Sequence, residues 1–227
     1  MEETAVLSTP SLTLRRTIAV ILGAAFVAAA AQVSVPLPGT PVPMTLQPLA
    51  VLLVGGLLGA RLGASSLVLY LALGVAGLPV FTPTVPLVGV ARLIGPTGGY
   101  LLAYPIAAFA VGWLTDPGRK PGERPSPAPG TAPERRPGEN PNRAPVPINP
   151  GLAPGVSEPS WLRVGLGVFA GLVLIHLGGL AQLLILTGDL SAATRFGTLP
   201  FLLGDLGKLA IALLVLKQTV TPLRARL

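Results

Sequence analysis

The feature that most constrains this chain is a series of long segments without a single charged residue. Residues 17–60 contain no Asp, Glu, Lys or Arg, and further uncharged runs cover residues 62–91, 93–115 and 164–188. A membrane-spanning helix needs about 20 mostly apolar residues, so these runs predict transmembrane helices. Charged residues make up only 11% of the chain, against about 25% in soluble domains. Such a chain cannot cover a water-facing surface.

Breaks within these runs divide them into six predicted helices. Four prolines between Val35 and Pro43 cannot sit in one helix, so residues 17–60 hold two spans. The other four spans are expected at about residues 62–78, 98–115, 164–188 and 199–216. The predicted fold is an all-α membrane protein with six transmembrane helices, in which residues 1–115 and 161–227 form one membrane domain.

A proline-rich segment, residues 116–160, separates the two apolar halves. It holds 13 of the 26 prolines, and eight of them recur at every fourth residue from Pro117 to Pro145. Proline is poorly tolerated inside helices, so we predict an extended, disordered linker. Proline-rich segments can dock on aromatic-lined domains, but a plain loop insertion is the favoured interpretation.

The distribution of Lys and Arg predicts the orientation in the membrane. Six spans place both termini on one side, together with the linker, and that side carries 13 basic residues. The opposite side carries only Arg92 and Arg195. By the positive-inside rule, both termini and the linker are cytoplasmic. The net charge of +7 therefore reflects orientation, and no basic patch indicates a nucleic-acid partner.

Two apolar, proline-rich loops lie on the predicted outer side, at about residues 35–48 and 79–96. Irregular backbone at membrane depth is tolerated where it is buried in protein or lines a cavity. We expect these loops to form a lid over a cavity, and the alternative is that they are short, rigid connectors.

Asp205 and Lys208 are the charges placed inside a predicted span. Residues three apart share a helix face and can pair, and charges in a membrane interior are costly, so the pair should face the bundle interior. An acceptor beside a cation suits a ligand that has both N–H groups and a carboxylate. The alternative is a structural pair that neutralises itself.

Other polar residues near the outer side are weaker candidates. Arg92 can hold a carboxylate bidentately or anchor the chain at the lipid headgroups. Gln47 can bind an amide-like ligand or cap its helix, and Tyr100 offers an apolar face with a polar tip. His176, the sole histidine, is expected to be a hydrogen-bonded residue of the bundle. No metal-ligand set, cofactor motif, phosphate loop or nucleophile–base pair is present, so neither a metal nor a cofactor nor an enzyme is predicted.

Small residues recur four apart in the first predicted helix, as Ala24/Ala28 and Ala25/Ala29. Such stripes let helices approach closely in lipid. They serve either internal packing or docking against another membrane protein.

Three segments together resemble the BioY family, the biotin-binding S components of energy-coupling factor (ECF) transporters. They are VPMTLQPLAVLLVGGLLGARLGASSLVLYLALGVAGLPVF at Val42 to Phe81, GPTGGYL at Gly95 to Leu101, and PFLLGDLGKL at Pro200 to Leu209. The resemblance covers about four-fifths of the chain, in both apolar halves. The proline-rich segment is not part of the family pattern.

The resemblance implies a biotin pocket near the outer surface, closed by the loops after the first and third helices. The residues that it implies for biotin binding are Gln47, Arg92, Tyr100, Asp205 and Lys208. Family members also use an Asn in the second outer loop. No Asn occurs between Leu78 and Tyr100 here, so that contact is absent or replaced by Thr82 or Thr84.

The resemblance also implies partners and a location, the plasma membrane of a bacterium. Small residues of the first helix, here Ala24, Ala25, Ala28 and Ala29, would contact a transmembrane coupling protein. Two ATPase subunits would supply the energy, since this chain has no phosphate loop. Two alternatives stay open, a solitary biotin transporter without an ATPase module and an S component for another small vitamin.

Overall fold

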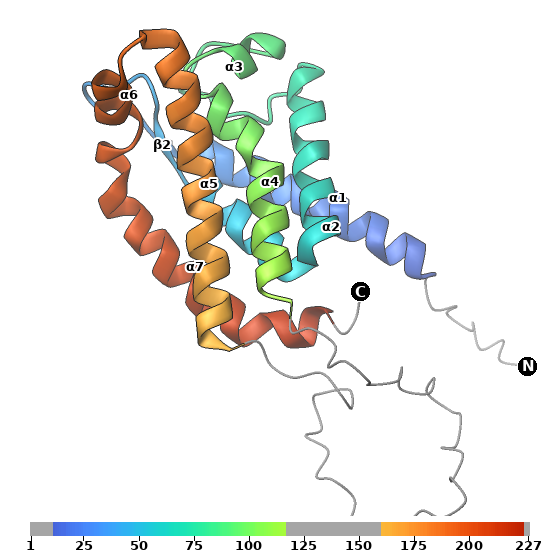
Figure 1. Ribbon diagram of the computed structural model, residues 1–227. Coiled ribbons are helices and arrows are strands. Elements are labelled where there is room, and N and C mark those ends of the chain that lie inside the picture. The colour runs from blue at the N-terminus through green and yellow to red at the C-terminus, as the bar shows by residue number, and fades with distance from the viewer. Residues whose placement is uncertain (1–10, 117–159, 225–227) are drawn as a thin grey trace, which may run out of the picture.

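The computed structural model describes residues 11–116 and 160–224 as an almost entirely helical bundle (Figure 1). The prediction of a disordered linker falls on residues 117–159, which lie outside the described residues. The elements are α1 (Leu12–Gln32), β1 (Ser34–Val35), β2 (Met44–Thr45), α2 (Gln47–Val75), α3 (Val90–Ile94), α4 (Gly98–Leu114), α5 (Trp161–Thr187), α6 (Leu190–Gly197), the 3-10 turn η1 (Leu199–Phe201) and α7 (Leu202–Arg224).

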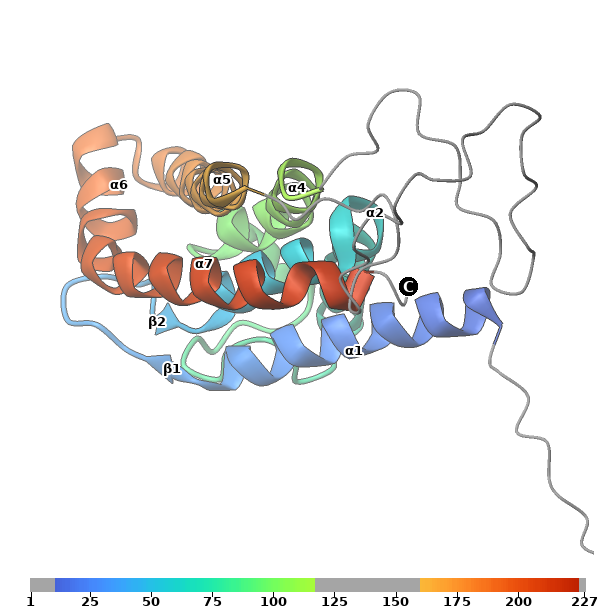
Figure 2. The same ribbon diagram turned by 90° about the horizontal axis from the view of Figure 1, so that it is seen from below.

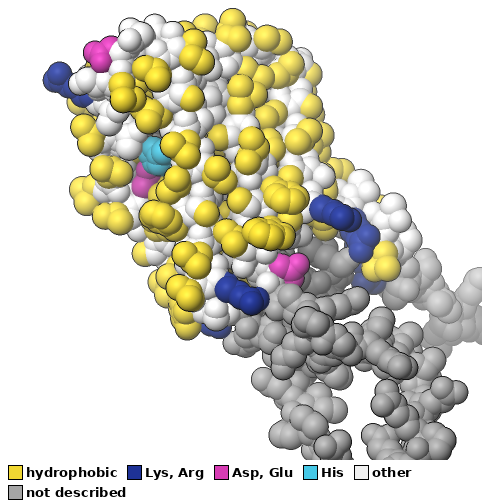
Figure 3. All heavy atoms as spheres, viewed as in Figure 1, with side chains coloured by type: hydrophobic (Ala, Val, Ile, Leu, Met, Phe, Trp, Pro, Cys, Tyr) yellow, Lys and Arg dark blue, Asp and Glu magenta, His cyan; other side chains and the backbone are white. Residues whose placement is uncertain are grey.

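By length and composition alone, four helical segments of the described residues could cross a membrane, and one of them, α2, contains a reversal. They are Leu12–Gln32, Gln47–Val75, Trp161–Thr187 and Leu190–Val220, and the apolar helix α4 is shorter, with 17 residues. Hydrophobic side chains cover much of the surface shown in Figure 3. The large hydrophobic residues that are exposed include Trp113, Phe169 and Leu203. Exposed apolar surface on this scale is typical of a protein that contacts lipid.

Helix α2 contains a sharp reversal at Gly59. This residue has φ 81° and ψ 175°, a conformation that is essentially restricted to glycine. A Cβ placed on Gly63 would lie 2.9 Å from the Cα of Gly55, whereas eight residues of straight helix rise about 12 Å. The chain therefore folds back between the two arms, 47–58 and 60–75. This reversal agrees with the predicted break beside Arg61.

The reversal leads to a testable expectation for stability. Replacing Gly59 with Ala should lower the free energy of unfolding by about 1–3 kcal/mol, because a Cβ is strained in this backbone conformation. Thermal unfolding of the purified protein in detergent measures the loss. Gly165→Ala is the matched control, since a Cβ there meets no atom within 4 Å and alanine favours a helix. Equal unfolding temperatures for the two variants would contradict the expectation.

Helix α4 lies between α2 and α5 and makes extensive contacts with both. Figure 2 shows α4 and α5 nearly end-on, whereas α1 and α7 run across the view, so these two helices are strongly inclined to the central ones. The backbones of α4 and α5 touch at Gly99 and Gly178, where a Cβ on either residue would collide with the other's carbonyl group. Close approach through small residues is the usual way in which helices pack in lipid.

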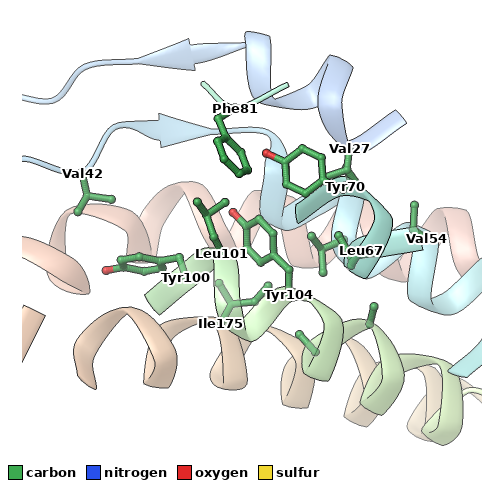
Figure 4. Packing of buried hydrophobic residues seen from close by; sticks show 14 of the residues in the cluster. Val27, Val42, Val54, Leu67, Tyr70, Phe81, Tyr100, Leu101, Tyr104 and Ile175 are labelled. Atoms are coloured by element: carbon green, nitrogen blue, oxygen red, sulfur yellow. The ribbon is translucent and has the colours of Figure 1, made fainter. Parts of the chain in front are cut away.

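The hydrophobic core lies where these helices meet the loops at one end. Figure 4 shows side chains of this cluster from α1, α2, α4, α5 and the loops, with Tyr70 and Phe81 in edge-to-face contact at a ring distance of 5.5 Å. A second cluster, around Leu52, Val168 and Leu216, joins α2, α5 and α7. The two clusters leave polar side chains at the loop end of the bundle.

Three elements of this end were not predicted. The first outer loop forms a short antiparallel hairpin, in which Ser34 pairs with Thr45 and Val35 with Met44. The short helices α3 and α6 lie in segments that were expected to be loops. The hydroxyl of Thr40 donates to the carbonyl of Phe196 at 2.6 Å, which ties the hairpin loop to α6.

Candidate functional site

A pocket lies at the loop end of the bundle, between the two outer loops and the helices α2, α4, α5 and α7. Its volume, counted as space for the centres of water-sized probes, is about 50 Å³. Its lining is Val42, Pro43, Thr45, Gln47, Pro48, Thr82, Arg92, Thr97, Tyr100, Leu101, Tyr104, Ile175, His176, Phe201, Asp205 and Lys208. All five predicted binding residues are in this set, and both outer loops contribute to it.

The centre of the polar lining is a buried carboxylate held by two helices. Asp205 lies in the first turn of α7, and its Oδ1 accepts a hydrogen bond from Lys208 Nζ at 2.9 Å. The predicted pairing at a spacing of three is confirmed, and both side chains are more than 90% buried. Asp205 Oδ2 lies 2.7 Å from His176 Nε2 on α5. The arrangement offers a negative acceptor beside a cation in an apolar enclosure.

Gln47 lines the pocket from the start of α2. Its Nε2 donates to the hydroxyl of Tyr70 at 2.6 Å, and its Oε1 accepts from Thr45 Oγ1 at 3.3 Å. The alternative of a helix cap is wrong, because the hydrogen bonds of the Gln47 side chain go to the side chains of Tyr70 and Thr45 and not to the backbone of α2. The contact with Tyr70 uses one of the two N–H donors of the Gln47 amide.

Arg92 on α3 is almost completely buried, with 1% of its surface exposed. Its guanidinium donates to the carbonyls of Thr82 at 2.9 Å and Val85 at 2.6 Å, and it lies 5.9 Å from the centre of the Phe81 ring. The alternative of an anchor at the lipid headgroups is therefore wrong. Burial lowers the pKa of the Arg92 guanidinium from its ordinary value. Among the described residues no acidic side chain pairs with Arg92, so this wall of the pocket carries an uncompensated positive charge.

Tyr100 joins the pocket to α6. Its hydroxyl donates to the carbonyl of Gly197 at 2.5 Å, and its ring lies edge-on to the His176 ring at 6.3 Å. Gly179 makes room for the Tyr100 ring, because a Cβ there would overlap it. The Tyr100 side chain thus packs α4 against α5 and fixes the end of α6 beside the pocket.

His176 is a polar residue of the pocket that the sequence analysis did not single out as functional. The prediction of a hydrogen-bonded histidine in the bundle is confirmed, but its partner is Asp205 and it lines the pocket. The two residues lie 29 positions apart on different helices, so no local spacing links them. The available signal was that the sole histidine and the Asp205–Lys208 pair both fall inside predicted spans.

In the second outer loop, Thr82 and Thr84 were the expected replacements for the missing Asn. Thr82 lines the pocket and its hydroxyl lies 3.0 Å from that of Thr84, which is not among the lining residues.

Across the parts of the chain that the structure describes, no group of three His, Cys, Asp or Glu side chains lies in a metal-binding arrangement.

The alanine stripe of α1 divides between two faces. Ala24 belongs to the core, and Ala28 packs against that core, so both serve internal packing. Ala25 and Ala29 are exposed. The docking of Ala24, Ala25, Ala28 and Ala29 on a partner stays a prediction, and Ala25 and Ala29 are the exposed members of this set.

The fold and the pocket together define a multi-pass helical membrane protein with an enclosed small-molecule pocket beneath two loops. A model of the BioY family matches residues 3–225. The chain belongs to the BioY family.

Curated relatives match over part of their length. The probable biotin transporter BioY of Pyrococcus horikoshii is 45% identical over 93 residues, which are 41% of this chain and 55% of that protein. The biotin transporter BioY2 of Lactococcus lactis subsp. cremoris is 45% identical over 94 residues, 41% of this chain and 50% of that protein. The biotin transporter BioY of Thermotoga maritima is 40% identical over 92 residues, 40% of this chain and 52% of that protein. The matched segment thus spans about half the length of these relatives.

A solved structure has the same fold. The S-component for biotin from an ECF-type ABC transporter superposes with a TM-score of 0.67 and 21% sequence identity, over 92% of this chain and 93% of that one. The likeness extends over both apolar halves.

Proposed function

We propose that this chain captures biotin as the substrate-binding S component of an ECF transporter. The observation that carries the proposal is that Gln47, Arg92, Tyr100, Asp205 and Lys208, chosen from the sequence, all line one enclosed pocket. The names of the relatives and of the similar solved structure, which are biotin transporters and a biotin S-component, support the choice of ligand.

The charges of the pocket suit a ligand with one carboxylate. Asp205 and Lys208 neutralise each other at 2.9 Å, whereas the Arg92 guanidinium donates its hydrogen bonds to backbone carbonyls and pairs with no acidic side chain among the described residues. A buried charge without a counter-charge is costly, so a carboxylate bound near Arg92 stabilises the complex. We therefore assign the biotin carboxylate to Arg92 and the ureido N–H groups to Asp205, with the apolar rings against Val42, Leu101 and Ile175.

Binding measurements test the proposal directly. The purified protein in detergent or nanodiscs should bind radiolabelled biotin at one site per chain, and riboflavin and thiamine should not compete. Absence of biotin binding would overturn the proposal, and competition by another vitamin would favour the alternative of an S component for that vitamin.

The membrane topology and the partners are part of the same proposal. Six spans, with the two arms of α2 counted separately and α6 left out, place both termini and the proline-rich segment in the cytoplasm of a bacterium, as the distribution of basic residues indicates. The exposed Ala25 and Ala29 would dock on a transmembrane coupling protein that works with two ATPase subunits. Proteoliposome uptake of biotin with and without such a module separates this arrangement from a solitary transporter.

A further inference from the structure

The sequence predicted the pair of Asp205 and Lys208, but Asp205 also has a second partner, His176. Lys208 lies on the same helix as Asp205, whereas His176 reaches the carboxylate from α5. The two bonds take different oxygens of Asp205, Oδ1 at 2.9 Å and Oδ2 at 2.7 Å. His176 thereby fixes the plane of the carboxylate, which Lys208 alone cannot do because a single bond permits rotation about it.

His176 also lies at a boundary between two spaces. It lines the enclosed pocket and, with Asp205, a second groove of about 460 Å³ between α5 and α7. The other groove residues are almost all apolar, among them Phe169, Leu172, Leu177, Leu202 and Leu206. Figure 3 shows a histidine and an acidic side chain among hydrophobic side chains on this face. The imidazole is thus part of the wall between the ligand pocket and the lipid-facing surface.

The hydrogen bonds of the imidazole indicate its protonation. An ionised carboxylate only accepts, so Nε2 of His176 carries the proton that it shares with Asp205. Nδ1 is buried and has no hydrogen-bond partner among the described residues. If Nδ1 also carried a proton, the charged imidazolium would have a buried N–H group without an acceptor. This costs more free energy than a buried nitrogen without a proton. The geometry therefore favours the neutral imidazole with its proton on Nε2.

We propose that neutral His176 is a positioning residue for biotin binding: its Nε2–H holds the Asp205 carboxylate toward the ligand and its ring closes the pocket between α5 and α7. This rests on the proposed function. The neutral form leaves the charges of Asp205 and Lys208 balanced, so that Arg92 alone attracts the ligand carboxylate.

Two substitutions separate the hydrogen bond from the packing. His176→Leu keeps the approximate size of the side chain but removes the N–H donor. It should weaken biotin binding about 10- to 100-fold, as expected for a lost hydrogen bond to a charged group. His176→Gln keeps an N–H donor at similar reach and should bind within about threefold of the parent. Leu166→Ala, an exposed position of the same helix, is the control for changes in α5.

The sole histidine also gives a direct spectroscopic test. In protein labelled with ¹⁵N-histidine and purified without a histidine tag, one imidazole should appear in the neutral Nε2–H form. Its Nε2 resonance should shift on addition of biotin and in Asp205→Asn. An imidazole that responds to neither change overturns the proposal, even where His176→Leu does not fold.

The outcomes distinguish this inference from the proposed function. Parent-like biotin binding by His176→Leu overturns the role of His176 and leaves the proposed function intact. Failure of the parent itself to bind biotin overturns both.

Discussion

Replacing Asp205 with Asn should reduce the affinity for biotin by at least about 100-fold. The Asp205 carboxylate is the shared partner of Lys208 at 2.9 Å and His176 at 2.7 Å, in a pocket where it is 3% exposed. Removing one member of a buried charge pair costs about 3–5 kcal/mol, because the other charge stays buried and uncompensated. The same change also removes the negative acceptor that we assign to the ureido N–H groups. Equilibrium binding of labelled biotin to the purified variant measures the loss.

Two further variants define what the Asp205 result means. Asp189→Asn is the control, because Asp189 is exposed and its side chain accepts a hydrogen bond from the Ser191 backbone at the start of α6. It should keep the affinity of the parent. Lys208→Ala should lose affinity in the same direction as Asp205→Asn. Unchanged affinity in both pocket variants would refute the assignment of the site.

The sequence predicts local features of this protein well, because they depend on neighbours along the chain. The uncharged runs predict the long helices, and a spacing of three places Lys208 next to Asp205. The break beside Arg61 was predicted because Arg61 interrupts the uncharged runs. In the structure the chain reverses two residues earlier, at Gly59. Each of these needs only helix periodicity and the cost of charge in lipid.

Contacts between distant segments could not be predicted from the spacing of residues along the sequence. The bond from His176 to Asp205 depends on the packing of α5 against α7, and the burial of Arg92 depends on how the second loop folds around it. Gln47 is similar, since its partner Tyr70 becomes a neighbour only after the chain reverses at Gly59. The resemblance to a family placed Gln47 and Arg92 in the pocket, but their partners emerged only from the structure.

The second large effect is expected for Arg92→Lys, a change that keeps the charge. The guanidinium donates from one nitrogen to the carbonyl of Val85 and from the other to that of Thr82. A lysine ammonium is a compact point charge and cannot reproduce this planar fork. The variant should therefore loosen the second outer loop and shift the cation away from the ligand carboxylate. Losing one or two hydrogen bonds to a charged group, at about 1.5–3 kcal/mol each, predicts biotin binding weaker by about 10- to 10,000-fold.

A neutral ligand shows whether the loss arises at the carboxylate. Biotinamide lacks the negative charge, so the parent should bind it more weakly than biotin, and Arg92→Lys should discriminate less between the two ligands. The ratio of the two discrimination factors, converted to free energy, is the coupling between the Arg92→Lys change and the ligand carboxylate, as in a double-mutant cycle. Arg195→Lys, an exposed position on α6, is the matched control and should behave like the parent. If Arg92→Lys weakens both ligands equally, Arg92 supports only the loop, and the carboxylate must be assigned to Lys208 instead.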